Sequence, residues 1–167
     1  SDLANLLEKA TGEKFIRMEM GVPGLAPSRI GTEAEIEALK HGVAQFYPML
    51  EGYPVLSEEA SRFVKNFMDV DIRPEGIIPT VGAMQASYVA FMALTECHKG
   101  KDTILFIDPG FPVQKTQLEV IGKPYQTFDI YEYREEKLEA KLREYLDRGN
   151  IAGIVYSNPN NPSWVCL

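Results

Sequence analysis

Cysteine and histidine are scarce in this sequence, and they are not arranged as a metal site. Cys97 and Cys166 are the only cysteines among 167 residues, and His41 and His98 are the only histidines. Zinc ligands typically come in close pairs such as C-x2-C or H-x3-H, and no such pair occurs. So few cysteines favour a reducing compartment, with one disulfide left open. We therefore expect no metal centre and a cytoplasmic protein.

Long apolar runs and positive charge are scarce as well. No stretch of about 18 apolar residues occurs, and the acidic first ten residues lack the basic start of a signal peptide. The 24 acidic residues outnumber the 17 basic ones, for a net charge of −7. This balance argues against nucleic-acid binding but permits a small anionic ligand. The motifs G-x-G-x-x-G and G-x-x-x-x-G-K-[ST] are both missing, which argues against a nucleotide-binding domain. We expect neither a membrane nor a nucleic acid as partner.

The residues that are present predict strands alternating with helices. Hydrophobic residues make up 45% of the chain, enough to build a core. Residues 21–27 carry too much Gly and Pro for a regular element. Short apolar runs predict strands at 77–81, 103–107, 124–130 and 151–156. Helical spacing predicts helices at about 33–46, 57–68, 83–98, 113–121 and 134–148. The expected class is α/β, a mainly parallel sheet with helices on both faces.

Three turns follow three of these predicted strands, namely Gly82–Met84, Asp108–Phe111 and Asn158–Pro162. Ligands bind beyond the carboxyl ends of parallel strands, so we expect the three turns to face one ligand. The first turn opens a helix, and free N–H groups at a helix start suit a phosphate. A left-handed turn without a ligand would explain Gly82 equally well.

The other two turns contain side chains suited to a flat polar ligand. Phe111 could stack on a ring, or it could pack into the core. Two prolines fix the backbone of the segment Asn158–Pro162, and each asparagine amide can both donate and accept. An Asx-turn explains one Asn and one Pro of this run but not the whole run.

Five segments, taken in order, resemble the N-terminal part of fold-type-I pyridoxal-5′-phosphate (PLP) enzymes, specifically the class I/II aminotransferases. They are Gly21-Val22-Pro23, Tyr47-Pro48-Met49-Leu50-Glu51-Gly52, Thr80-Val81-Gly82-Ala83-Met84-Gln85-Ala86, Asp108-Pro109-Gly110-Phe111-Pro112 and Asn158-Pro159-Asn160-Asn161-Pro162-Ser163. The resemblance implies the front part of the large domain, incomplete. Residues 1–46 would form the small-domain or dimer-arm side, and residues 47–167 a partial PLP-binding domain.

The resemblance also implies a role for each matching position. Asn161 would donate to the phenolic oxygen of PLP, and Phe111 would stack on its pyridine ring. The backbone N–H groups of Gly82, Ala83 and Met84 would hold the phosphate. In a homodimer, Tyr47 would reach the phosphate of the neighbouring subunit, and Gly21 would lie near the substrate carboxylate.

The sequence departs from the family after Pro162, where Ser163-Trp164 replaces the usual Thr-Gly. None of its lysines stands at the position of the family's Schiff-base lysine, which is expected beyond Leu167. We therefore expect a fragment that holds no catalytic residue and is inactive alone. The whole protein would be an aminotransferase that moves an amino group between an amino acid and a 2-oxo acid.

Two alternatives to an aminotransferase stay open. One is another fold-type-I PLP activity: a β-lyase, a decarboxylase or a synthase. The other is a non-catalytic PLP-fold module that binds or regulates.

Overall fold

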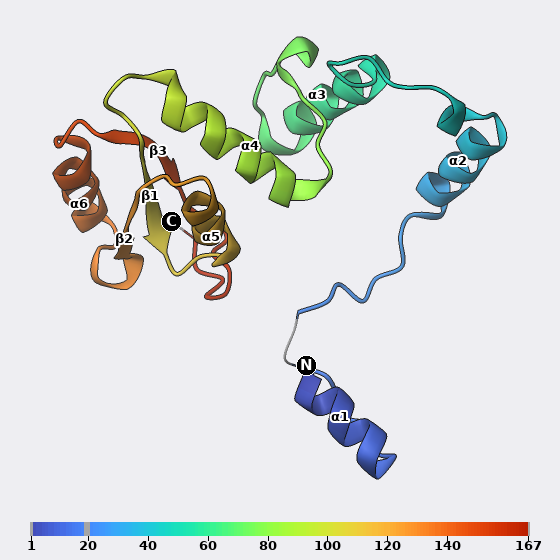
Figure 1. Ribbon diagram of the computed structural model, residues 1–167. Coiled ribbons are helices and arrows are strands. Elements are labelled where there is room, and N and C mark those ends of the chain that lie inside the picture. The colour runs from blue at the N-terminus through green and yellow to red at the C-terminus, as the bar shows by residue number, and fades with distance from the viewer. Residues whose placement is uncertain (1, 19–20, 167) are drawn as a thin grey trace. The chain divides into compact units, whose positions relative to one another are not determined.

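The computed structural model describes residues 2–18 and 21–166, and the chain divides into two compact units at residues 49 and 50 (Figure 1). The elements of the first unit are α1 (Asp2–Thr11), α2 (Arg29–Lys40) and the short 3-10 helix η1 (Val43–Gln45). Helix α2 begins after Ser28, four residues before the predicted start at 33. It ends well short of residue 46 because Gly42 takes a left-handed backbone conformation with φ of 79°.

The second unit contains the sheet and the remaining helices. Its elements are α3 (Pro54–Met68), η2 (Pro74–Gly76), α4 (Gly82–Cys97), β1 (Thr103–Asp108), α5 (Val113–Val120), β2 (Tyr125–Asp129), η3 (Ile130–Glu132), α6 (Glu136–Leu146) and β3 (Ile151–Val155). Helix α3 starts three residues earlier than predicted, because Pro54 occupies its first turn, where a missing N–H costs nothing. Across the described parts of both units, every helix is too short or too polar to cross a bilayer.

The sheet is parallel, with strand order β2-β1-β3. Central strand β1 aligns Leu105 with Gln126 of β2 and with Ile154 of β3. Parallel neighbours require crossover connections, which α5 supplies between β1 and β2 and α6 supplies between β2 and β3. The α/β class with a mainly parallel sheet is therefore confirmed.

Alternate residues of β1 enter two separate cores, one on each face of the sheet. Ile104 and Phe106 pack with Phe91 of α4 and Leu118 of α5. Leu105 and Ile107 pack on the other face with residues of β2, β3 and α6. Figure 1 shows α5 and α6 on opposite sides of the strands. Because β1 is covered on both faces, its apolar run is continuous, as the sequence predicted.

The predicted strand at 77–81 is wrong. Residues 77–80 have no regular secondary structure, and the side chains of Ile78 and Val81 are largely exposed. Pro79 lacks the N–H that a central strand would donate, and the segment leads directly into α4. The turn at Gly82 therefore follows an irregular segment, and only the other two predicted turns follow strands.

Candidate functional site

The turn after β1 is held closed by an ion pair. The Nζ atom of Lys115, in α5, lies 2.8 and 2.6 Å from the two carboxylate oxygens of Asp108. Both side chains are about three-quarters buried, and the pair brackets the turn that contains Gly110 and Phe111. Lys115 also lies over the ring of Phe106, 5.6 Å from its centroid. Phe111 is thus presented on a tightly fastened turn, with nearly half of its surface exposed.

The loop after β3 closes on itself through Asn160. The backbone N–H of Asn160 donates to the carbonyl of Val165 at 2.8 Å, and its carbonyl accepts from the N–H of Trp164 at 2.6 Å. The peptide bonds before Pro159 and Pro162 are cis. The loop directly follows β3 and contains neither a helix nor a strand.

Phe111 and Asn161 line the same cavity, at the carboxyl ends of neighbouring strands β1 and β3. The cavity has a volume of about 150 Å³. Its walls are formed by Phe106, Ile107, Gly110, Phe111, Gln114, Val155, Tyr156, Ser157 and Asn161. This is the edge of a parallel sheet at which ligands bind. The structure thus brings together two of the predicted site residues, 50 positions apart in the sequence.

The two adjacent asparagines differ in their surroundings. Asn160 is buried, and both its side-chain nitrogen and its side-chain oxygen are hydrogen-bonded. The backbone N–H of Asn161 donates to the Ser157 hydroxyl at 3.3 Å, whereas its side-chain amide has no partner among residues 2–18 and 21–166. A free amide at a cavity wall is available to a ligand.

The start of α4 does not line this cavity, but it is fastened to α5. The Gln117 side chain donates to the carbonyl of Met84 at 2.8 Å and accepts from the hydroxyl of Ser87 at 2.8 Å. Gly82 has a φ of 75° and no atom within 4 Å of the position that a Cβ would occupy. Its N–H donates to Thr80. The N–H groups of Ala83 and Met84, in the first turn of the helix, are therefore the better placed for an anion.

Tyr47 and Gly21 belong to the first unit. Tyr47 is fully exposed, and no atom lies within 4 Å of the position that a Cβ would occupy at Gly21. Both surroundings leave room for a contact with another molecule. Their roles toward the cofactor phosphate and the substrate carboxylate stay predictions.

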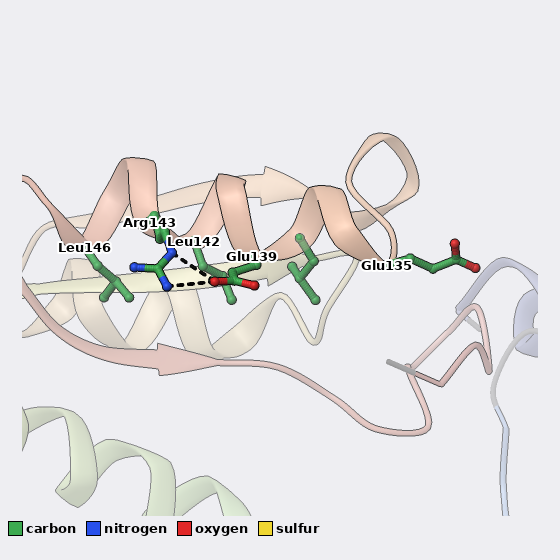
Figure 2. A pocket seen from close by; sticks show the side chains of 6 residues that line it. Glu135, Glu139, Leu142, Arg143 and Leu146 are labelled. Carbon is green, nitrogen blue, oxygen red and sulfur yellow. Dashed lines mark hydrogen bonds and ion pairs between the residues drawn. The ribbon is translucent and has the colours of Figure 1, made fainter.

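A larger hollow, of about 490 Å³, lies along the flank of α6 (Figure 2). Its floor is leucine at positions 138, 142 and 146, and its rim carries Glu135, Glu139 and Arg143. Glu139 accepts from Arg143 at 2.7 and 3.0 Å, and this hydrogen bond is the main cause that raises the pKa of Arg143. Glu139 and Arg143 are paired with each other, Glu135 has no ion-pair partner among the described residues, and no strand ends there, so we place the candidate site at the strand ends and not in this hollow.

The sequence analysis did not identify Asn160 and Lys115, whose side chains hold in place the two loops that line the cavity. The adjacent asparagines Asn160 and Asn161 indicate an unusual turn. No local pattern in the sequence shows which of the two side-chain amides is buried in the loop and which lines the cavity. The spacing Asp108 to Lys115 crosses a turn containing proline and glycine, so no helical or strand periodicity marks it as a pair. Only the path of the chain after β1 brings the two charges together.

Comparison with known proteins identifies the family of this fold and cavity. Residues 13–163 match the family described as aminotransferase class I and II. Aspartate aminotransferase from Pyrococcus horikoshii is 30% identical over all of this chain, which covers 42% of that protein. The S-alkyl-thiohydroximate lyase of Arabidopsis thaliana is 27% identical over 92% of the chain, which covers 34% of the lyase.

The solved structures agree with the sequences. Alanine aminotransferase from Pyrococcus furiosus superposes with a TM-score of 0.76 and 29% identity, over 95% of this chain and 40% of that one. The chain thus spans about two fifths of the length of the aminotransferases it matches. With the family matched over most of its residues, the chain belongs to the class I and II aminotransferases.

Proposed function

We propose that the protein carrying this chain is a PLP-dependent aminotransferase, which moves an amino group from an amino acid to a 2-oxo acid. The observation that carries the proposal is the shared cavity of Phe111 and Asn161 at the ends of β1 and β3. Family membership supports the same conclusion independently. The activity belongs to the whole protein, of which this chain supplies part of the cofactor pocket.

The residues of the cavity fit the chemistry of PLP. Its flat pyridine ring suits the half-exposed ring of Phe111, and its phenolic oxygen suits the unpartnered amide of Asn161. A phosphate suits the N–H groups of Ala83 and Met84, and the open space beside Gly82 permits its close approach.

Each of these residues has a defined task in such a site. When bound, PLP supplies an electron sink for the carbanion that forms at the substrate Cα. Asn161 donates a hydrogen bond that orients the ring, and Phe111 covers one ring face and excludes water from it. The ammonium of Lys115 is engaged by both oxygens of Asp108, so this lysine serves the turn and not the substrate. The Schiff-base lysine that family membership implies is assigned to the part of the protein outside these residues.

We further propose a cytoplasmic homodimer. The thiols of Cys97 and Cys166 are both free and exposed, which suits a reducing compartment. The exposed Tyr47 would reach the phosphate bound by the partner subunit, and Gly21 would border the substrate carboxylate. Sedimentation of the full-length protein at increasing dilution tests the dimer. A monomer at micromolar concentration that still binds PLP would remove the role given to Tyr47.

The experiment that tests the function uses the full-length protein, PLP and a panel of amino acids. We expect a visible absorption band from bound PLP, and consumption of the amino acid only when a 2-oxo acid is supplied. A protein that shows no such band after incubation with PLP would contradict the proposal.

A PLP-dependent lyase is the second candidate, favoured by the similarity to the S-alkyl-thiohydroximate lyase. A lyase consumes its substrate without a 2-oxo acid, so the same assay separates the two activities. Bound PLP with no turnover of any amino acid would instead indicate a binding or regulatory module.

A further inference from the structure

Asn160 links the two loops that line the cavity. Its side-chain Nδ2 donates to the carbonyl oxygen of Pro109 at 2.6 Å, across 51 residues of sequence. Its Oδ1 accepts from the Ser163 N–H at 3.2 Å and from the Ser163 hydroxyl at 2.7 Å. Both polar atoms of the side chain therefore have partners within the protein, and only 9% of the residue is exposed.

The bond to Pro109 reaches the turn that presents Phe111. Pro109 stands between Asp108, which is fixed by Lys115, and Gly110, which forms part of the cavity wall. The turn is thus fastened at its start by an ion pair and from across the cavity edge by the amide of Asn160. A partly buried hydrogen bond of this kind fixes loop geometry, because leaving either partner without its hydrogen bond destabilises the fold.

We propose that Asn160 is a positioning residue, which fixes the β1–α5 turn to the loop after β3 and so holds Phe111 and Asn161 in register around one ligand. This inference rests on the proposed function, because the ligand is taken to be PLP. Asn160 does not touch the ligand itself. Its neighbour Asn161 contacts the ligand. Of the two adjacent asparagines, Asn160 therefore holds the loops in place and Asn161 binds.

Register between the two loops affects binding because both contacts are directional. Ring stacking and amide donation each depend on position to within a fraction of an ångström. Without the Asn160–Pro109 bond, the turn keeps its ion pair but loses its connection to Asn161. Phe111 is half exposed, so packing alone does not hold it in place.

Three variants of the full-length protein separate this role from a general effect on folding. Asn160→Asp keeps the oxygen that accepts from Ser163 and replaces the donor to Pro109 by a second oxygen. Ser163→Ala removes a bond inside the loop and leaves the link to Pro109 intact. Tyr145→Phe is the matched control, because it removes a hydroxyl bond of 3.1 Å to the backbone of Thr127, in the core on the α6 side.

We expect Asn160→Asp to weaken PLP binding by about tenfold or more, since one buried hydrogen bond is lost and a carbonyl is left facing an anion. The visible circular dichroism of bound PLP, which reports the tilt of its ring, should change as well. Ser163→Ala and Tyr145→Phe should stay within about twofold of the parent affinity. Equal affinity and an unchanged dichroism band in Asn160→Asp would overturn the proposal. If that variant does not fold, Asn160→Ala replaces it in the same comparison.

Hydrogen exchange without cofactor distinguishes failure of this inference from failure of the proposed function. The amides of residues 110–116 other than Pro112, among them the Lys115 N–H that donates to the carbonyl of Pro112, should exchange faster in Asn160→Asp than in the parent and in Tyr145→Phe. A parent protein that does not bind PLP would refute the proposed function, and the exchange of this segment would then decide the role of Asn160 alone. Unchanged exchange there would refute that role whether or not PLP binds.

Discussion

At the scale of single residues, the site depends on side chains of the same type in different surroundings. Asn160 is buried, and its side-chain amide hydrogen-bonds to Pro109 and Ser163, whereas Asn161 lines the cavity. A substitution therefore has a different effect at each of the two asparagines. Loss of Asn160 disturbs the loop, and loss of Asn161 removes a ligand contact only.

The Asn161→Ala variant of the full-length protein should bind PLP about tenfold more weakly, because one hydrogen bond to the ring is lost. The free energy of unfolding without PLP should stay within about 0.5 kcal/mol of the parent value, since the side-chain amide of Asn161 has no partner among the described residues. Titration of PLP by visible absorbance and urea unfolding measure the two quantities. Unchanged affinity and spectrum would remove the role given to Asn161.

Trp164 occupies a backbone conformation that favours glycine, with a φ of 52°, and its side chain is 83% exposed. A left-handed conformation costs a non-glycine residue about 1–2 kcal/mol. Trp164→Gly should therefore raise the free energy of unfolding by up to about 1 kcal/mol, part of the relief being offset by the more flexible unfolded chain. Trp164→Ala keeps the strain and serves as the control. Equal stability of the two variants in urea unfolding would contradict this account.

At the scale of elements, helix α6 shows what an amphipathic pattern determines. The sequence predicts a helix from 134 to 148, and the structure has one from 136 to 146, with Leu138 and Leu142 against the core. Its outer face carries a charged cluster in which Glu144 contacts Lys141 at 2.7 Å and Arg148 at 2.9 Å. The hydrogen bond from Lys141 is the main cause that lowers the pKa of Glu144, and the nearby charges of Lys141 and Arg148 lower it further.

The lowered pKa of Glu144 makes this contact dependent on pH. A carboxyl whose pKa is lower in the folded than in the unfolded state stabilises the fold above its unfolded pKa, and this contribution is lost as pH falls through the folded pKa. Glu144→Gln should therefore be less stable than the parent at pH 7, and the difference should shrink as pH falls through the folded pKa of Glu144. The effect is small because the pair is exposed to solvent. Urea unfolding at a series of pH values below 7 measures it, and a difference that does not shrink on acidification would refute the ionic origin.

Local patterns predicted the elements well where one signal dominates. The uninterrupted apolar run of β1 and the charged face of α6 each determine an element, and both appear within two residues of their predicted bounds. The segment 77–81 misled because its apolar residues resemble a strand, while Pro79 and the absence of a pairing partner prevent one. Helix α2 ends before its predicted end at residue 46, although apolar residues continue at helical spacing, because Gly42 takes a left-handed backbone conformation.

The candidate site was predictable only in part. The predicted strand ends indicate where Phe111 and Asn161 lie, and in the structure both residues line one cavity. The contacts that hold them in place join residues remote in sequence, such as Asn160 with Pro109, and no local pattern encodes such contacts. The hydrogen bond that joins α4 to α5 through Gln117 was not predictable from the sequence for the same reason.

At the scale of the whole molecule, the chain leaves many large apolar side chains exposed. They occur on both units and include Leu3, Leu6, Phe63, Phe67, Met68, Val89 and Met92. Apolar surface of this extent ordinarily marks an interface with further protein. The chain also spans about two fifths of the length of the aminotransferases it matches.

These exposed surfaces predict different behaviour for the 167-residue chain and for the full-length protein. Expressed alone, the chain should bind a dye specific for apolar surface, such as ANS, and show no visible absorption with PLP. The full-length protein should bind little dye and show the absorption. Similar dye fluorescence from both would mean that the further residues do not cover these side chains.

The most direct test of the account is a crystal structure of the full-length protein grown with PLP. The account predicts the ring of Phe111 stacked on the pyridine and Nδ2 of Asn161 within hydrogen-bond distance of the phenolic oxygen. The phosphate should lie against the N–H groups of Ala83 and Met84. A PLP molecule bound elsewhere, or one that contacts neither Phe111 nor Asn161, would contradict it.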